Sequence, residues 1–78
     1  MKYVVLSEDN TVVEGFLEMG VEAFLADEDS ALSFVQDALS DESVGTLLVS
    51  QKVYKAAEKT IEEHRGKGIL PFVMTLDR

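Results

Sequence analysis

Two neighbouring segments decide the fold: "KYVVLS" at residues 2–7 and "NTVVEGFLEMG" at residues 10–20. The first is short, rich in valine and followed by polar residues, which indicates a buried strand. In the second, apolar residues recur at helical spacing. Asp9 or Asn10 can cap its start, and Gly20 can end it. The pair predicts a strand followed by a helix.

The same alternation continues along the chain. We expect strands at residues 22–26, 44–50 and 70–76, and helices at residues 27–42 and 51–66. The strands are continuous apolar runs, which is typical of strands covered on both faces. Helix-length connections allow parallel pairing with right-handed crossovers. The sequence therefore predicts an α/β fold: a small open parallel four-stranded sheet, flavodoxin-like, in order 2-1-3-4, with helices on both faces.

The helix expected at residues 51–66 is the most regular. Tyr54, Ala57 and Ile61 are predicted to face inward. His64, the only histidine, is predicted to be exposed near the helix C-terminus, where it complements the helix dipole. Lys52, Lys55 and Lys59 alternate with Glu58 and Glu62, which is typical of a solvated face, with a docking patch as the alternative. Pro71 lies near the start of the last strand, where an edge strand tolerates its missing N–H.

Size and charge limit the function. Residues 1–78 are expected to form one domain, without disulfides because there is no cysteine. The net charge of −8 is uneven: residues 1–50 carry eleven acids and one base, whereas residues 51–78 carry six bases and four acids. Such a chain repels nucleic acid and anionic lipid, and it favours a basic protein partner. No apolar run is long enough for a signal peptide or a membrane span, so we expect a cytoplasmic protein without membrane insertion.

In a sheet of this order, ligands bind beyond the carboxyl ends of the first and third strands. That crevice is predicted to be lined by Ser7, Glu8, Asp9, Asn10, Ser50 and Gln51. A phosphoacceptor receiver domain would use an acidic pair such as Glu8 and Asp9 for magnesium, but Ser50 stands where its nucleophilic aspartate would be. A phosphate cradle would need small or glycine residues, and the two acids oppose an anion there.

We therefore expect Glu8 and Asp9 to cap the following helix, and we expect no catalytic, cofactor or metal site. A degenerate receiver-like signalling domain, built on the Glu8 and Asp9 pair, is the alternative.

Four stretches together resemble the F subunit of the V/A-type rotary ATPases. They are "MKYVVLSEDNTVVEGF", "EGFLEMGV", "ESVGTLLVSQKV" and "ILPFVMTLD", in that order. The resemblance implies the globular, flavodoxin-like domain of a non-catalytic central-stalk subunit that binds the coiled-coil D subunit and couples or regulates rotation. It also implies a place at the cytoplasmic periphery of a membrane complex that moves protons or sodium ions and makes or hydrolyses ATP. The family also has a C-terminal stalk helix, which we do not expect within residues 1–78.

The partner surface is expected at the crevice and the adjacent lysines. The residues concerned are Glu8, Asp9, Asn10, Ser50, Gln51, Lys52 and Lys55. A further expectation is self-association of the isolated chain through the edge strand at residues 70–76.

Overall fold

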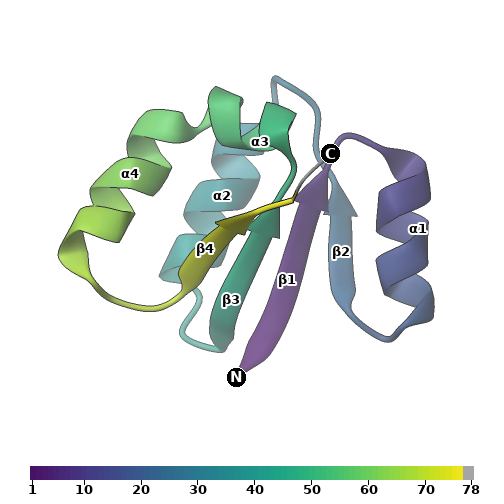
Figure 1. Cartoon of the computed structure of the whole chain (residues 1–78), viewed down its shortest axis with the longest axis horizontal. Coiled ribbons are helices and arrows are strands. Elements are labelled where there is room, and N and C mark those ends of the chain that lie inside the picture. Colours follow the sequence, from purple (N-terminus) through teal and green to yellow (C-terminus); the bar gives the residue numbers. More distant parts are fainter. Residues whose placement is uncertain (77–78) are drawn as a thin grey trace.

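The computed structural model describes residues 1–76 and shows one parallel sheet with helices on both of its faces (Figure 1). The elements are β1 (Lys2–Ser7), α1 (Asn10–Glu18), β2 (Glu22–Leu25), α2 (Ala31–Ser40), β3 (Val44–Val49), α3 (Gln51–Ala56), α4 (Glu58–Lys67) and β4 (Phe72–Thr75). The strand order is β2-β1-β3-β4, so the predicted fold class and order are confirmed. The single-domain prediction covered residues 1–78, of which Asp77 and Arg78 lie outside the described residues.

The centre of the sheet is the pairing of β1 with β3. Val5 lies opposite Leu48 of β3 and, on the other side, opposite Ala23 of β2. Val5 is completely buried, as are Leu47 and Val49 of β3. Burying a side chain of this kind stabilises the fold by about 1.5–3 kcal/mol. The two central strands therefore carry much of the apolar burial.

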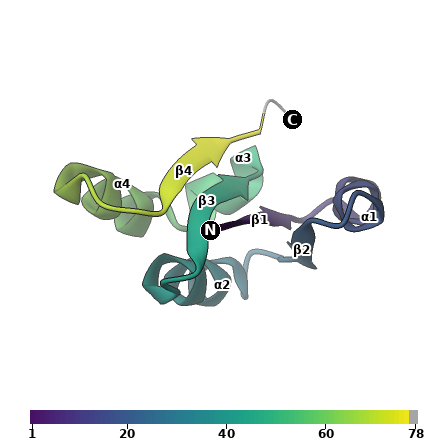
Figure 2. The same cartoon turned by 90° about the horizontal axis from the view of Figure 1, so that it is seen from below.

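Two apolar cores lie on opposite sides of the sheet. The larger core joins Val4 and Leu6 of β1 to α2, α3 and α4 through Val35, Val53 and Ile61. The smaller core joins Val5 and Ala23 to α1 through Val13. Figure 2 shows α2 beneath the central strands and α1 beside β2. This division follows from the right-handedness of the crossovers. The chain moves across the sheet in one direction from β1 to β2, which places α1 on one face. It moves in the opposite direction from β2 to β3 and β4, which places α2, α3 and α4 on the other face.

The prediction of one continuous helix over residues 51–66 was wrong. The helix is interrupted at Ala57, whose backbone has φ −124° and ψ 21°. Its N–H still donates to the carbonyl oxygens of Val53 and Tyr54, both 3.1 Å away. α3 contacts β1 whereas α4 contacts β4, so the change of direction lets two short helices follow the sheet. Ala57 and Ile61 are buried and Tyr54 is partly buried, as the sequence predicts.

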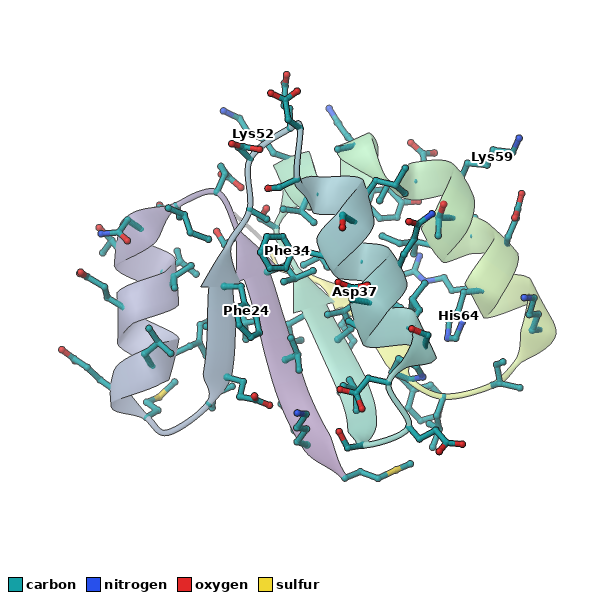
Figure 3. All side chains as sticks on the ribbon, turned by 180° about the vertical axis from the view of Figure 1, so that it is seen from behind. Phe24, Phe34, Asp37, Lys52, Lys59 and His64 are labelled. Carbon is teal, nitrogen blue, oxygen red and sulfur yellow. The ribbon has the colours of Figure 1, made fainter. Side chains whose placement is uncertain are left out.

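The prediction that His64 is exposed was also wrong. Its side chain is only 6% exposed, and Nε2 donates a hydrogen bond of 2.8 Å to the carbonyl oxygen of Pro71, the residue before the edge strand β4 (Figure 3). Arg65 makes a parallel connection, because its Nη2 donates to the Val73 carbonyl oxygen at 2.8 Å. Its Nη1 lies 2.7 Å from Glu62, which also accepts a hydrogen bond from Tyr54. These contacts fix α4 against β4 and α3.

The hydrogen bond between Tyr54 and Glu62 changes both acidities. It is the main cause that raises the pKa of the Tyr54 hydroxyl and lowers the pKa of the Glu62 carboxyl. Glu62 is therefore ionised near neutral pH, as its ion pair with Arg65 requires.

Within residues 1–76, part of the sheet on the α1 side has no helix over it. α1 packs over β1 and β2, while Phe72 and Met74 of β4 point to this side and are 66% and 56% exposed. Tyr3 of β1 is 58% exposed. An apolar surface of this kind beside an edge strand favours association.

We predict that the isolated chain self-associates as its concentration rises, and that the double variant Phe72→Ser/Met74→Ser is monomeric under the same conditions. Sedimentation equilibrium would measure the molar mass. Leu17→Ser removes a similarly exposed apolar side chain from α1 and should leave association unchanged. A wild-type chain that stays monomeric at millimolar concentration would refute the prediction.

A second prediction concerns the anchoring of α4. His64→Ala removes a buried donor and leaves the Pro71 carbonyl without it, which should lower the free energy of unfolding by about 1–3 kcal/mol. Urea denaturation would measure it. The neighbouring substitution Glu63→Ala, on an exposed residue, should stay within about 0.5 kcal/mol. Equal stability of the two variants would show that this hydrogen bond contributes nothing.

Candidate functional site

The carboxyl ends of the strands form a surface whose loops are held to the sheet by backbone hydrogen bonds. Ser50 N donates to Leu6 O at 3.0 Å, and Ala26 N donates to Ser7 O at 2.9 Å. Leu76 N donates to Val49 O at 2.7 Å. These bonds extend strand pairing one residue beyond the strands, so the loops at this end are positioned by the sheet itself.

Ser50 and Glu8 join the two sides of the predicted crevice. The Ser50 hydroxyl donates to Glu8 Oε1 at 2.5 Å. The same hydroxyl oxygen accepts from Val53 N at 3.2 Å, which makes Ser50 the N-cap of α3. Ser50 is 2% exposed, and its hydroxyl makes two structural hydrogen bonds, one to Glu8 and one from the Val53 backbone. The sequence analysis placed both residues at the same crevice, but it did not predict the hydrogen bond between them.

Asp9 caps α1, as the sequence predicts. Its Oδ1 accepts from Thr11 N at 2.9 Å, and its own N–H donates to the buried Ser7 hydroxyl at 3.0 Å. Glu8 does not share this capping role, because its carboxylate turns to Ser50. Capping by Glu8 was therefore a wrong prediction. The acidic pair is divided between two structural tasks, which is unlike a pair of carboxylates converging on one magnesium ion.

The remaining predicted interface residues surround this centre. Asn10 is the exposed first residue of α1, and Gln51 donates from Nε2 to Leu76 O at 3.3 Å. Lys52 lines a hollow of about 240 Å³ together with Glu8 and Ala26. Lys55 lies next to Lys52 along a second, more open hollow that Glu28 also lines.

Figure 3 shows Lys52 near the loop before α2 and Lys59 on α4. The break at Ala57 separates the lysines, so a single row of three along one helix does not form.

The loop before α2 contributes acids that the sequence analysis did not assign to this surface. Asp27 Oδ1 accepts from Ser30 N at 2.8 Å and from Asp29 N at 3.0 Å, while Ser30 Oγ accepts from Asp27 N. Ser30 occupies the N-cap position of α2 without a side-chain capping bond to that helix. The hydrogen bond from the Ser30 backbone is the main cause that lowers the pKa of Asp27. The signal in the sequence is the run "DEDS", whose short polar side chains favour turns.

We use the name carboxyl-end surface for Glu8, Asp9, Asn10, Ser50, Gln51, Lys52 and Lys55. It carries both signs of charge, with Asp27 and Glu28 beside Lys52. Within residues 1–76, no group of three or more acidic or histidine side chains is arranged to hold a metal ion. In that same part of the chain, no helix has the length and apolar character needed to cross a membrane.

Comparison with known proteins identifies the family. No curated protein matches the chain. The model of the family described as ATP synthase (F/14-kDa) subunit matches residues 4–78, nearly the full sequence. The match agrees with the resemblance to the F subunit of V/A-type ATPases and with the parallel α/β sheet. The chain therefore belongs to the ATP synthase (F/14-kDa) subunit family and is a subunit of a rotary ATPase.

Proposed function

We propose that this chain is a non-catalytic central-stalk subunit that binds the coiled-coil D subunit and couples or regulates rotation. Membership of the ATP synthase (F/14-kDa) subunit family is the observation that carries the proposal. We further propose that it works on the cytoplasmic side, peripheral to the membrane part of the complex. In this role the domain transmits force through contacts, without chemistry of its own.

The hydrogen bonds at the carboxyl-end surface support the non-catalytic part of the proposal. Ser50 caps α3 and binds Glu8, and Asp9 caps α1. A nucleophile must be within reach of its substrate, whereas the Ser50 side chain is only 2% exposed. Asp9 and Ser50 instead hold the starts of α1 and α3, and Glu8 binds Ser50, which suits a docking surface.

The distribution of charge supports a protein partner of the coiled-coil type. The carboxyl-end surface presents Lys52 and Lys55 beside Glu28. A coiled coil exposes rows of charged residues along its e and g positions. Charges of both signs on the docking surface can pair with such rows and fix the orientation of the domain, while the acidic residues 1–50 attract a basic partner over a longer distance.

The test is binding to the cognate coiled-coil stalk subunit, measured by isothermal titration calorimetry in buffers of low and high salt. We expect a defined complex that weakens as salt rises, because exposed charges are screened over about 8 Å at physiological ionic strength. The variant Lys52→Glu/Lys55→Glu should bind roughly tenfold more weakly than wild type, a change of about 1.4 kcal/mol.

Lys59→Glu/Lys67→Glu is the matched control. It changes the net charge equally but places the change on α4. Equal loss in both variants would argue against a contact at the carboxyl-end surface. Absence of any complex at low salt would refute the proposed function.

A further inference from the structure

A second surface, the α2 groove, lies between α2 and the strands β1 and β2. It is a hollow of about 310 Å³ whose floor is apolar, formed mainly by Val4, Leu6, Phe24 and Phe34. The groove exists because α2 packs over β1 and β3, so the edge strand β2 is only partly covered on this side. Figure 3 shows Phe24 and Phe34 side by side at the border of α2.

The accessible part of the floor of the α2 groove is aromatic. The rings of Phe24 and Phe34 stack with their centroids 5.7 Å apart. Phe24 remains 41% exposed, whereas Val4 and Leu6 of the neighbouring strand β1 are almost completely buried. Parallel sheets normally have both faces covered by helices. The α2 side of β2 is thus an uncovered strip that another helix could complete.

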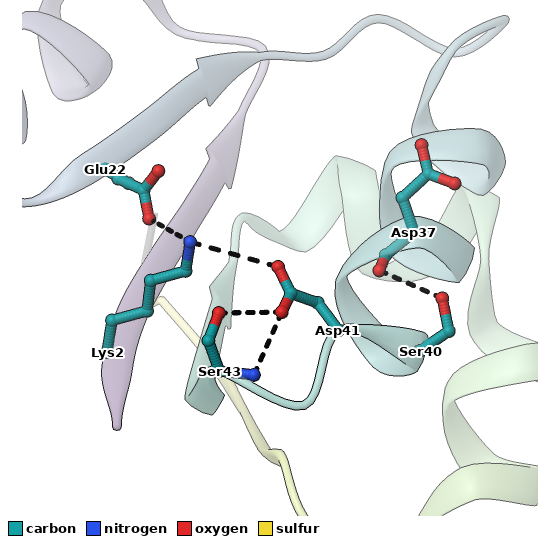
Figure 4. Close-up of polar contacts among 6 residues, drawn as sticks. All are labelled: Lys2, Glu22, Asp37, Ser40, Asp41 and Ser43. Atoms are coloured by element: carbon teal, nitrogen blue, oxygen red, sulfur yellow. Dashed lines mark hydrogen bonds and ion pairs between the residues drawn. The ribbon is translucent and has the colours of Figure 1, made fainter.

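The rim of the α2 groove is acidic. Glu22, Asp37 and Asp41 stand around it together with Lys2, so three acids and one base give this rim a net charge of −2. Lys2 Nζ lies 2.7 Å from Glu22 and 3.8 Å from Asp41 (Figure 4). The Asp41 carboxylate also accepts from the Ser43 hydroxyl at 2.6 Å. Hydrogen bonding to Glu22 raises the pKa of Lys2, and hydrogen bonding from Ser43 lowers the pKa of Asp41, so these rim groups are charged at neutral pH.

Asp37 is the rim acid that is free to bind. The Ser40 hydroxyl donates to its backbone carbonyl oxygen (Figure 4). Within residues 1–76 its carboxylate has no hydrogen bond or ion pair. It projects from α2 beside the apolar floor. A cation approaching along the groove would meet this carboxylate without displacing an existing partner.

The α2 groove and the hollow beside Lys52 lie on the same side of the sheet, one after the other along β1. Successive side chains of a strand alternate between its faces, so Phe24 and Ala26 share a side, as do Leu6 and Glu8. The first of each pair lines the α2 groove, and the second lines the hollow beside Lys52. A helix laid parallel to β1 in the α2 groove would meet, at the carboxyl end, the loop that connects β2 to α2, whose residues Ala26, Asp27 and Glu28 line the second hollow. The six residues of β1 span about 20 Å, which matches roughly 13 residues of α-helix.

We propose that the α2 groove receives an amphipathic helix of the coiled-coil stalk subunit, with apolar residues on the floor and lysine or arginine beside Asp37. This inference rests on the proposed function and specifies where and how the partner is held. Charge complementarity selects the occupant, since the acidic rim favours a helix with basic flanks. A second copy of this chain is disfavoured because its own acidic rim would be brought against the first.

The test uses the full chain and the coiled-coil stalk subunit, with dissociation constants from isothermal titration calorimetry. Asp37→Lys should weaken binding roughly tenfold. Glu63→Lys makes the same charge change on an exposed residue of α4 and should change the dissociation constant less than about twofold. Phe24→Ser should also weaken binding, whereas Phe72→Ser, on the opposite side of the sheet, should not. Thermal unfolding of each variant identifies any that fails to fold.

The outcomes separate the two proposals. If wild type binds the coiled-coil stalk subunit and both groove variants bind equally well, the groove inference is overturned while the proposed function stands. If wild type does not bind at all, both are overturned. Dimerisation of the chain alone that Phe24→Ser abolishes would assign the groove to a second copy and overturn the inference.

Discussion

The pairing of β1 with β3 is the constraint on which the other features depend. With β1 inside the sheet, right-handed crossovers place α1 on one face and α2, α3 and α4 on the other. The hydrogen bond from Ser50 N to Leu6 O continues that pairing past the ends of the strands. It brings Ser50 beside Glu8 and sets the start of α3. The carboxyl-end surface is therefore a direct extension of the central ladder.

The same crossovers leave two parts of the sheet uncovered within residues 1–76, one on each face. The helices of this part of the chain are too few to cover both faces fully, and α2 lies over β1 and β3 because it must connect β2 with β3. The strip over β2 becomes the α2 groove, and the strip over β4 exposes Phe72 and Met74. The two differ in charge: three carboxylates surround the first, whereas Thr46 and Leu48 neighbour the second and Arg65 lines the hollow beside it. That difference favours a basic helical partner for the groove and unselective apolar contact for the β4 side.

Local pattern was sufficient to predict the strand order and the capping by Asp9. It failed where distant parts of the chain decide the outcome. Nothing in "KAAEKT" breaks a helix, yet the chain turns at Ala57 because α3 and α4 pack on different strands. His64 is buried against the Pro71 carbonyl, a partner that no local pattern around residue 64 reveals. The hydrogen bond between Glu8 and Ser50 joins residues 42 positions apart in the sequence. The α2 groove depends on how α2 crosses the sheet. Neither feature can therefore be recognised in a short segment of sequence.

The two surfaces on the α2 side suit different parts of a binding event. Charges on a solvent-exposed rim act over about 8 Å in physiological salt and mainly speed and orient the encounter. An aromatic side chain contributes about 1.5–3 kcal/mol when it goes from exposed to buried, and Phe24 is already stacked, so little side-chain freedom is lost. A partner helix would thus be oriented by Asp37 and the lysines at the carboxyl end, and retained by the apolar floor. Such an attachment would resist sliding along the stalk. Any movement would remove Phe24 from its apolar contact and, at the same time, separate Asp37 from its basic partner.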